Sequence, residues 1–314
     1  MRDAFFRALL ETAERDPRVH LIVGDLGFGV VEAFARRFPD RFLNTGVAEQ
    51  NMTGIAAGMA LCGKVVFTYS IANFPTLRCL EQIRNDVCYH GADVKIVAVG
   101  GGFAYGALGV THHATEDLAI LRALPGMTVV APGDPVEAAL ATRAVVDWPG
   151  PCYLRLGRAG EPVVHTGPVD FRLGRAVTVR PGGDLTLIST GAMLETGVRV
   201  ADWLGTRGIG TRVLSLHTLK PLDVDAVLAA ASETRAVVTL EEHSVIGGLG
   251  SAVAEVLAER AEARVPFKML GLPSAFAAET GSQAFMRDRE GLSPDAIRAT
   301  LHPFLKAVFP DFHG

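Results

Sequence analysis

Short apolar runs alternate with stretches of helical periodicity along the chain. The runs in the first half are Val19–Val23, Val65–Thr68, Val94–Val99, Thr128–Ala131 and Tyr153–Leu156. Between the second and the third run, apolar residues from Leu77 to Val87 recur three and four positions apart, which predicts a helix with one buried face. This alternation is typical of βαβ units around a mostly parallel sheet, so we expect an α/β fold.

Glycine and proline gather between Arg158 and Asp184, which indicates a crossing between two domains. We place a first domain at residues 1–160, a linker at 161–183 and a second domain at 184–314. The second domain repeats the alternation, with apolar runs at Leu185–Ser189, Thr211–Ser215, Ala236–Leu240 and Phe267–Leu270. The expected architecture is two doubly wound domains, each with a mostly parallel sheet.

The composition narrows the possible partners of this 314-residue chain. Hydrophobic residues make up 49% of it and charged residues 20%, which is typical of a globular protein with a sizeable core. The net charge of -4 lacks the basic excess that a nucleic-acid backbone requires. We therefore expect no nucleic-acid partner.

The longest uncharged stretch, residues 96–115, is long enough to span a bilayer. It contains five glycines, however, and is typical of a buried strand that runs into a glycine loop. The first sixteen residues are charged and amphipathic and lack the apolar core of a signal peptide. These features predict no membrane-spanning helix and a cytoplasmic location.

The segment from Asn44 to Ala60 places Glu49 in the first turn of a helix made largely of small and apolar residues. One interpretation is a first-turn acid favoured by the helix dipole, which contributes about 0.3–1 kcal/mol at an exposed site. The other is a buried acid kept for proton exchange, because an unpaired buried carboxylate costs several kcal/mol or has a raised pKa. The spacing alone leaves both open.

The order of residues around this glutamate carries a resemblance. Val47-Ala48-Glu49-Gln50-Asn51, followed by the small-residue helix, resembles the pyrimidine-binding signature of the transketolase family, thiamine-diphosphate enzymes that transfer two-carbon ketol units. The likeness continues through residues 81–84, 111–118, 124–127 and 131–134, and in the second half through 218–223, 241–243 and 247–251. It therefore implies a pyrimidine-binding domain followed by a transketolase C-terminal domain.

The resemblance implies roles for three side chains. The family glutamate that matches Glu49 hydrogen-bonds the N1′ atom of the cofactor's aminopyrimidine and favours the tautomer that deprotonates the thiazolium. His112 matches the family histidine that faces the reacting carbonyl. His113, next to it, is a second candidate for binding the substrate.

Four further residues are candidates for binding cofactor or substrate. An aromatic ring should stack on the pyrimidine, and Phe74 or Tyr69 could supply it, although such a ring can equally belong to the core. Arg158 falls where the family keeps an arginine for the substrate phosphate, and a guanidinium suits phosphate oxygens. Arg155 could serve instead, and either arginine could be a surface charge.

One family motif is missing from the chain. The family binds the cofactor's diphosphate through a divalent metal, Mg²⁺ or Ca²⁺, using a Gly-Asp-Gly motif, and that tripeptide does not occur in these 314 residues. The chain thus resembles the C-terminal subunit of a split enzyme. We expect an N-terminal partner subunit that carries this motif, in an α2β2 assembly, and no metal ligand on the present chain.

Two departures concern the substrate. The family's Asp-Gly-Pro ahead of the Thr-His pair is replaced by Leu108-Gly109-Val110. The family's phosphate-binding histidine falls at about Gly100, and an upstream arginine falls near Glu32 or Ala33. These changes predict a donor other than an ordinary pentose or hexose phosphate handled in the usual way.

Several alternatives stay open from the sequence. The β subunit of a 2-oxoacid dehydrogenase E1 component and a deoxyxylulose-phosphate-synthase-like enzyme share the two-domain plan. A regulatory or scaffold homologue without catalysis is a candidate from another class, although a retained Glu49 and His112 argue against it. A nicotinamide site at Gly27-Phe28-Gly29 is disfavoured because Glu32 replaces the third glycine of that motif.

Overall fold

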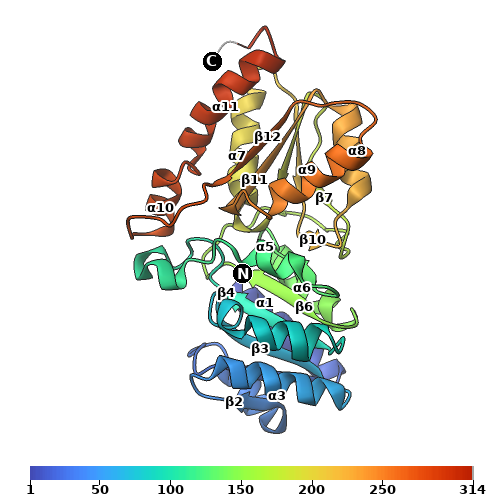
Figure 1. The fold of residues 1–314 in the computed structure, drawn as a ribbon, viewed down its shortest axis with the longest axis vertical. Coiled ribbons are helices and arrows are strands. Elements are labelled where there is room, and N and C mark those ends of the chain that lie inside the picture. The colour runs from blue at the N-terminus through green and yellow to red at the C-terminus, as the bar shows by residue number, and fades with distance from the viewer. Residues whose placement is uncertain (313–314) are drawn as a thin grey trace.

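The computed structural model describes residues 1–312, which form two α/β units stacked along the long axis of the molecule (Figure 1). The N-terminal unit is built on a seven-stranded sheet with the order β10-β5-β6-β4-β3-β1-β2. Its strands are β1 (Val19–Val23), β2 (Phe42–Asn44), β3 (Val65–Ile71), β4 (Val94–Val99), β5 (Thr128–Val130), β6 (Cys152–Leu156) and β10 (Thr218–Lys220). All neighbouring strands are parallel except β10, which pairs antiparallel with β5.

Helices cover both faces of this sheet, which explains why a strand such as β4 is buried along its whole length. They are α1 (Arg2–Arg15), α2 (Glu32–Arg37), α3 (Glu49–Leu61), α4 (Leu80–Gln82), α5 (Asp117–Ala123) and α6 (Pro135–Val146). Residues of α1 and α6 share one apolar cluster, which includes Phe5 and Val145. Residues of α3 and α5 share another, which includes Met52 and Leu118.

The C-terminal unit has a five-stranded sheet with the order β12-β11-β8-β9-β7. Its strands are β7 (Val177–Arg180), β8 (Leu185–Ser189), β9 (Thr211–Ser215), β11 (Ala236–Ser244) and β12 (Phe267–Leu272). The helices of this unit are α7 (Leu194–Gly205), α8 (Val224–Glu233), α9 (Leu249–Arg260), α10 (Gln283–Arg289) and α11 (Pro294–Val308). Only β7 runs antiparallel to its neighbour.

The expected fold class, two mostly parallel α/β units, is confirmed. Three short strands, β2, β7 and β10, were not indicated by the apolar runs. Strand β7 forms inside residues 161–183, the expected linker, and pairs with β9. Strand β10 comes from the second half of the chain but joins the first sheet beside β5.

The helix predicted between β3 and β4 is irregular. It consists of a 3₁₀ turn (Leu77–Cys79), the short α4, and a π-helical segment (Ile83–Cys88). Ile83 and Val87 are buried, as the periodicity predicted, but Leu77, where the predicted face begins, is exposed because the segment starts as a 3₁₀ turn. No helix in residues 1–312 is both long and apolar enough to cross a membrane.

Candidate active site

Glu49 begins α3, and only 1% of its surface is exposed. One carboxylate oxygen, Oε2, accepts a hydrogen bond from Arg78 Nη1 at 2.9 Å, and the other, Oε1, accepts one from Ser70 Oγ at 3.3 Å. A Cβ on Gly24, at the end of β1, would lie 3.3 Å from the glutamate's Cγ. Glu49 is therefore both a first-turn acid and a buried one, enclosed by the ends of two neighbouring strands.

Arg78 separates this carboxylate from open space. Its side chain is 47% exposed, and its guanidinium carbon lies 5.0 Å from the centre of the Phe74 ring. The side chain of Gln50, on the first turn of α3, donates to the backbone carbonyl of Arg78 at 3.1 Å. The partner of the buried acid is thus a long, flexible side chain at the surface, which can move without opening the core.

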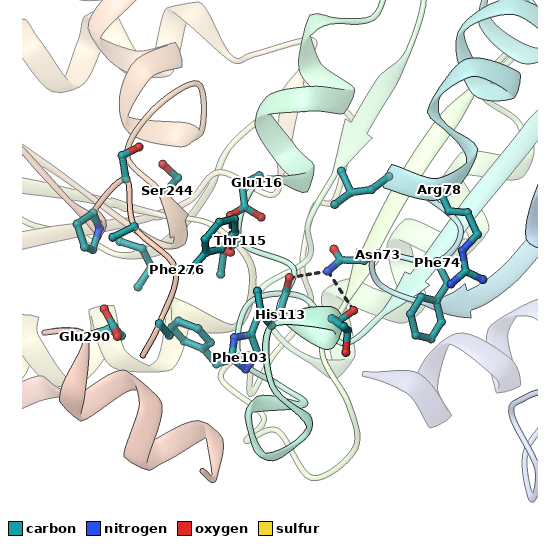
Figure 2. A pocket seen from close by; sticks show the side chains of 18 residues that line it. Asn73, Phe74, Arg78, Phe103, His113, Thr115, Glu116, Ser244, Phe276 and Glu290 are labelled. Carbon is teal, nitrogen blue, oxygen red and sulfur yellow. Dashed lines mark hydrogen bonds between the residues drawn. The ribbon is translucent and has the colours of Figure 1, made fainter. Parts of the chain in front are cut away.

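A cavity of about 690 Å³ extends from this pair to the C-terminal unit. Phe74 and Arg78 line one end, and Ser244, Phe276 and Glu290 line the other (Figure 2). The two units therefore form the walls of one cleft, and Glu49 lies behind Arg78 at its edge.

Asn73 joins two loops in the wall of the cleft. Its Nδ2 donates to the carbonyl of His113 at 2.7 Å and to that of Thr111 at 3.4 Å (Figure 2). Its Oδ1 is buried and has no hydrogen-bond partner among residues 1–312. The loop that carries the two histidines is thus fixed by Asn73, which keeps one free acceptor.

The two adjacent histidines differ in environment. His112 is half-buried, its ring lies 5.1 Å from that of Phe74, and its Nδ1 is 3.0 Å from Thr111 Oγ1. Burial, together with the neighbouring His113, lowers the pKa of His112, so its imidazole is neutral at pH 7. His113 is buried, and its Nε2 is held 3.1 Å from the carbonyl of Gly106. Within residues 1–312, the Nε2 of His112 makes no hydrogen bond, whereas His113 is held within the loop although it lines the cleft.

The two candidate aromatic residues are also separated. Phe74 lines the cleft. Tyr69 is buried under α1, where it stacks on Phe5 at 6.1 Å and meets the edge of Phe6 at 4.9 Å. Phe74 alone of the two presents a ring to the cleft.

Arg155 lies within β6, and Arg158 follows two residues after the end of this strand. Arg155 is 5% exposed; its Nε donates to Asp117 Oδ2 at 2.8 Å and its Nη2 to the carbonyl of Ala114 at 2.7 Å. Arg158 is exposed, and its Nη1 donates to the carbonyl of Ala104 at 3.2 Å. The structure therefore buries Arg155 in a bridge to α5 and leaves Arg158 open to a ligand.

Three residues of this site were not predicted from the sequence: Ser70, Asn73 and Arg78. A signal for Arg78 was available, because it is the one charged residue between Ser70 and Leu80. Its pairing with Glu49 depends on the irregular turn after β3, which no periodicity predicts.

Comparisons with known proteins match both units. A family model described as "Transketolase, pyrimidine binding domain" matches residues 1–161, and one described as "Transketolase, C-terminal domain" matches residues 174–297. A subunit of the apulose-4-phosphate transketolase of Phocaeicola vulgatus is 39% identical over 94% of this chain and 96% of its own. The 6-deoxy-6-sulfo-D-fructose transketolase subunit SqwH of Clostridium sp. is 39% identical over 96% of this chain and 93% of its own.

A solved structure described as "Split gene transketolase, inactive beta4 tetramer" is 38% identical, covers 98% of both chains and has a TM-score of 0.89. A 1-deoxy-D-xylulose-5-phosphate synthase of Desulforudis audaxviator is 35% identical over 95% of this chain, which spans only 47% of that enzyme. The chain belongs to the transketolase family and consists of its pyrimidine-binding and C-terminal domains.

Proposed function

We propose that the chain is the C-terminal subunit of a split thiamine-diphosphate-dependent transketolase, which transfers a two-carbon ketol unit from a ketose donor to an aldehyde. The observation that carries this proposal is Glu49. Its carboxylate is buried at the start of α3 and separated from the cleft by one half-exposed arginine.

The residues around Glu49 fit the aminopyrimidine end of the cofactor. A buried carboxylate with spare acceptor capacity suits a ring N–H, and the Phe74 ring suits a flat heterocycle. When bound, thiamine diphosphate supplies the carbanion chemistry, and the protein supplies position and proton control. Glu49 would hold the proton at N1′ once Arg78 has moved aside.

His112 would orient the substrate carbonyl. Because its pKa is lowered, the neutral ring has one nitrogen that donates and one that accepts. If the hydroxyl of Thr111 donates to Nδ1, the proton resides on Nε2, which can then donate to a substrate oxygen. The pairing with Thr111 therefore prepares this histidine to act as a donor.

The diphosphate and its Mg²⁺ or Ca²⁺ would lie on an N-terminal partner subunit with the Gly-Asp-Gly motif, in an α2β2 assembly. Two observations support this proposal: the relatives are named as subunits, and this chain does not contain the motif. Large apolar side chains are also exposed near the site, and Phe28 and Val47 are each 75% exposed. Such residues are typical of a surface that a partner covers.

The donor would be a modified ketose handled in the cytoplasm. Leu108 and Gly100 replace polar residues of the family pattern. The relatives, in turn, are named for apulose 4-phosphate and 6-deoxy-6-sulfofructose, two unusual sugars. Both observations favour a donor that differs from the common pentose and hexose phosphates.

The test is to purify the chain alone and with a partner subunit that carries the motif, and to measure ketol transfer and thiamine-diphosphate binding. We expect both only in the pair. Glu49→Gln in the pair should keep assembly intact and reduce turnover by about 10²–10⁴-fold, as expected for loss of a proton-transfer group. Glu14→Gln, an exposed glutamate on α1, is the matched control.

Near-normal turnover of the Glu49→Gln pair would overturn the proposal, as would tight cofactor binding by the chain alone. Reduction of a lipoyl acceptor in place of ketol transfer would instead indicate the β subunit of a 2-oxoacid dehydrogenase.

A further inference from the structure

Tyr105 belongs to the loop that follows β4, and its ring packs against Gly100 at the end of that strand. Gly100 ends that strand with φ of +102°, and a Cβ there would come 2.3 Å from Cδ2 of the Tyr105 ring. No side chain at position 100 could coexist with this ring. The glycine therefore makes room for the tyrosine.

Tyr105 and Arg158 present polar groups that the protein leaves free. The guanidinium carbon of Arg158 lies 5.4 Å from the centre of the Tyr105 ring. Within residues 1–312, the tyrosine hydroxyl makes no hydrogen bond, and Arg158 uses only Nη1, toward Ala104. One hydroxyl and several guanidinium N–H groups thus remain for a ligand.

These two side chains continue the series of contacts that begins at Glu49. Arg78 contacts Glu49 and lies over Phe74, and the Phe74 ring lies 5.1 Å from that of His112. The His112 ring lies 6.3 Å from that of Tyr105. A substrate whose reacting carbonyl meets His112 can therefore extend its other end to Tyr105 and Arg158.

The local charge favours an anion. The carboxylate of Glu161, beside Arg158, is paired with the Met1 ammonium at 2.6 Å. The backbone N–H of Arg2 donates to the carbonyl of Arg158 at 2.9 Å, and the Arg2 guanidinium is paired with Asp3. Arg158 itself has no carboxylate partner among residues 1–312, so its charge is available.

We propose that Tyr105 is a specificity-determining residue that, together with Arg158, binds an oxyanion tail of the donor ketose. Its hydroxyl donates to a tail oxygen, and the guanidinium supplies charge and further donors. Phosphate and sulfonate share this chemistry. The inference rests on the proposed ketol transfer and names the part of the donor that this end of the site recognises.

The test uses the assembled complex and three donors: hydroxypyruvate, whose single oxyanion is the carboxylate bonded to the reacting carbonyl, fructose 6-phosphate, and 6-deoxy-6-sulfofructose. We expect Tyr105→Phe to raise KM about tenfold for the preferred tailed donor, since a hydrogen bond to a charged group is lost, and to leave kcat and the KM of hydroxypyruvate within twofold. Arg158→Gln should raise the same KM further. Tyr89→Phe, at an exposed tyrosine that does not line the cleft, is the matched control.

A second measurement does not depend on turnover. Phosphate and methanesulfonate are titrated into the complex and followed by thermal shift, and the ion that resembles the natural tail should bind more weakly to Tyr105→Phe. Equal affinity for both ions in the variant and the wild type would overturn the role of Tyr105, as would an equal rise in KM for hydroxypyruvate. The two proposals can fail separately. If the role of Tyr105 is overturned but ketol transfer is still lost in Glu49→Gln, the proposed function stands.

Discussion

Two regions of the molecule bury a carboxylate against an arginine, and they differ in how completely the pair is closed. At the start of α3, Glu49 is bonded to Arg78, which is about half exposed. At the junction of the two units, Asp117 is bonded to Arg155, which is almost fully buried. Asp117 also accepts a hydrogen bond from the hydroxyl of Tyr153 at 2.5 Å.

Glu242, a second buried acid at the junction of the two units, resembles Asp117 in having its carboxylate fully hydrogen-bonded. It accepts from Nε and Nη2 of Arg287 at 3.0 and 2.7 Å, from the side chain of Gln283, and from the backbone N–H of Phe103. Gly102 allows this approach, since a Cβ there would lie 2.5 Å from the Glu242 carboxyl carbon. The acids at the junction accept hydrogen bonds from groups inside the fold, whereas the Glu49 carboxylate accepts, among residues 1–312, only from Ser70 and from a surface arginine. The number of hydrogen bonds that each carboxylate accepts therefore distinguishes the structural acids Asp117 and Glu242 from Glu49, which can still bind a ligand.

The largest expected effect comes from breaking the closed pair. Arg155→Met leaves Asp117 as an uncompensated buried charge, and we expect it to lower the free energy of unfolding by about 3–5 kcal/mol. Urea denaturation of the purified chain measures this. Arg155→Lys, which keeps the charge but not the fork, should recover part of the loss. A stable Arg155→Met with a raised donor KM would contradict the comparison and make Arg155 a substrate ligand.

A fourth buried acid, Glu241, gives a smaller, pH-dependent effect. Glu241 accepts from the backbone N–H groups of Leu249 and Gly250 at the start of α9, yet burial raises its pKa from 4.5 to about 7. The folded state therefore binds a proton that the unfolded state has released. The resulting stability is complete below pH 4.5 and is lost as the pH rises to about 7, up to roughly 3 kcal/mol at 1.36 kcal/mol per pKa unit.

Glu241→Gln removes this titration. Between pH 4.5 and 8, the stability difference between wild type and variant should drift in favour of the variant as the pH rises. Thermal unfolding across that range measures it. A difference that is constant with pH would mean that Glu241 keeps an ordinary pKa in the folded state.

The smallest effect is expected at the open pair. Arg78→Leu removes the partner of a buried carboxylate that borders the cleft, so water can reach this carboxylate once the arginine is gone. We expect a loss of about 1–2 kcal/mol in the free energy of unfolding, between the values for an exposed pair and for a closed one, measured beside Arg155→Met under the same conditions. A loss as large as that of Arg155→Met would show that Glu49 depends on its arginine in the same way as Asp117.

The sequence predicted the strands because their apolar runs are long and buried on both faces, as in β1 and β4. It also placed Glu49 in the first turn of a helix, because the small and apolar residues that follow it are typical of a buried helix. It named Arg158 first and left Arg155 as the alternative, because β6 is buried throughout and has no alternation that marks Arg155 as a structural residue. The distinction comes from Asp117, which lies elsewhere in the chain and meets Arg155 only after folding.

The same limit applies to Tyr105 and to the short strands. The position of the Tyr105 ring depends on the backbone of Gly100, not on a pattern of residue types. Strands β7 and β10 contain four and three residues, too few for a periodic signal. Their pairing depends on neighbours that are distant in sequence.

Strand β10 has a consequence for dividing the protein. It covers the outer edge of β5, so a fragment that stops after β6 would expose the unpaired N–H and C=O groups of β5 to solvent. Bare edges of this kind recruit strands from other molecules. A protein truncated at the apparent domain boundary should therefore self-associate. A chimera that exchanges C-terminal domains between homologues should keep residues 218–220 from the same homologue as the first half.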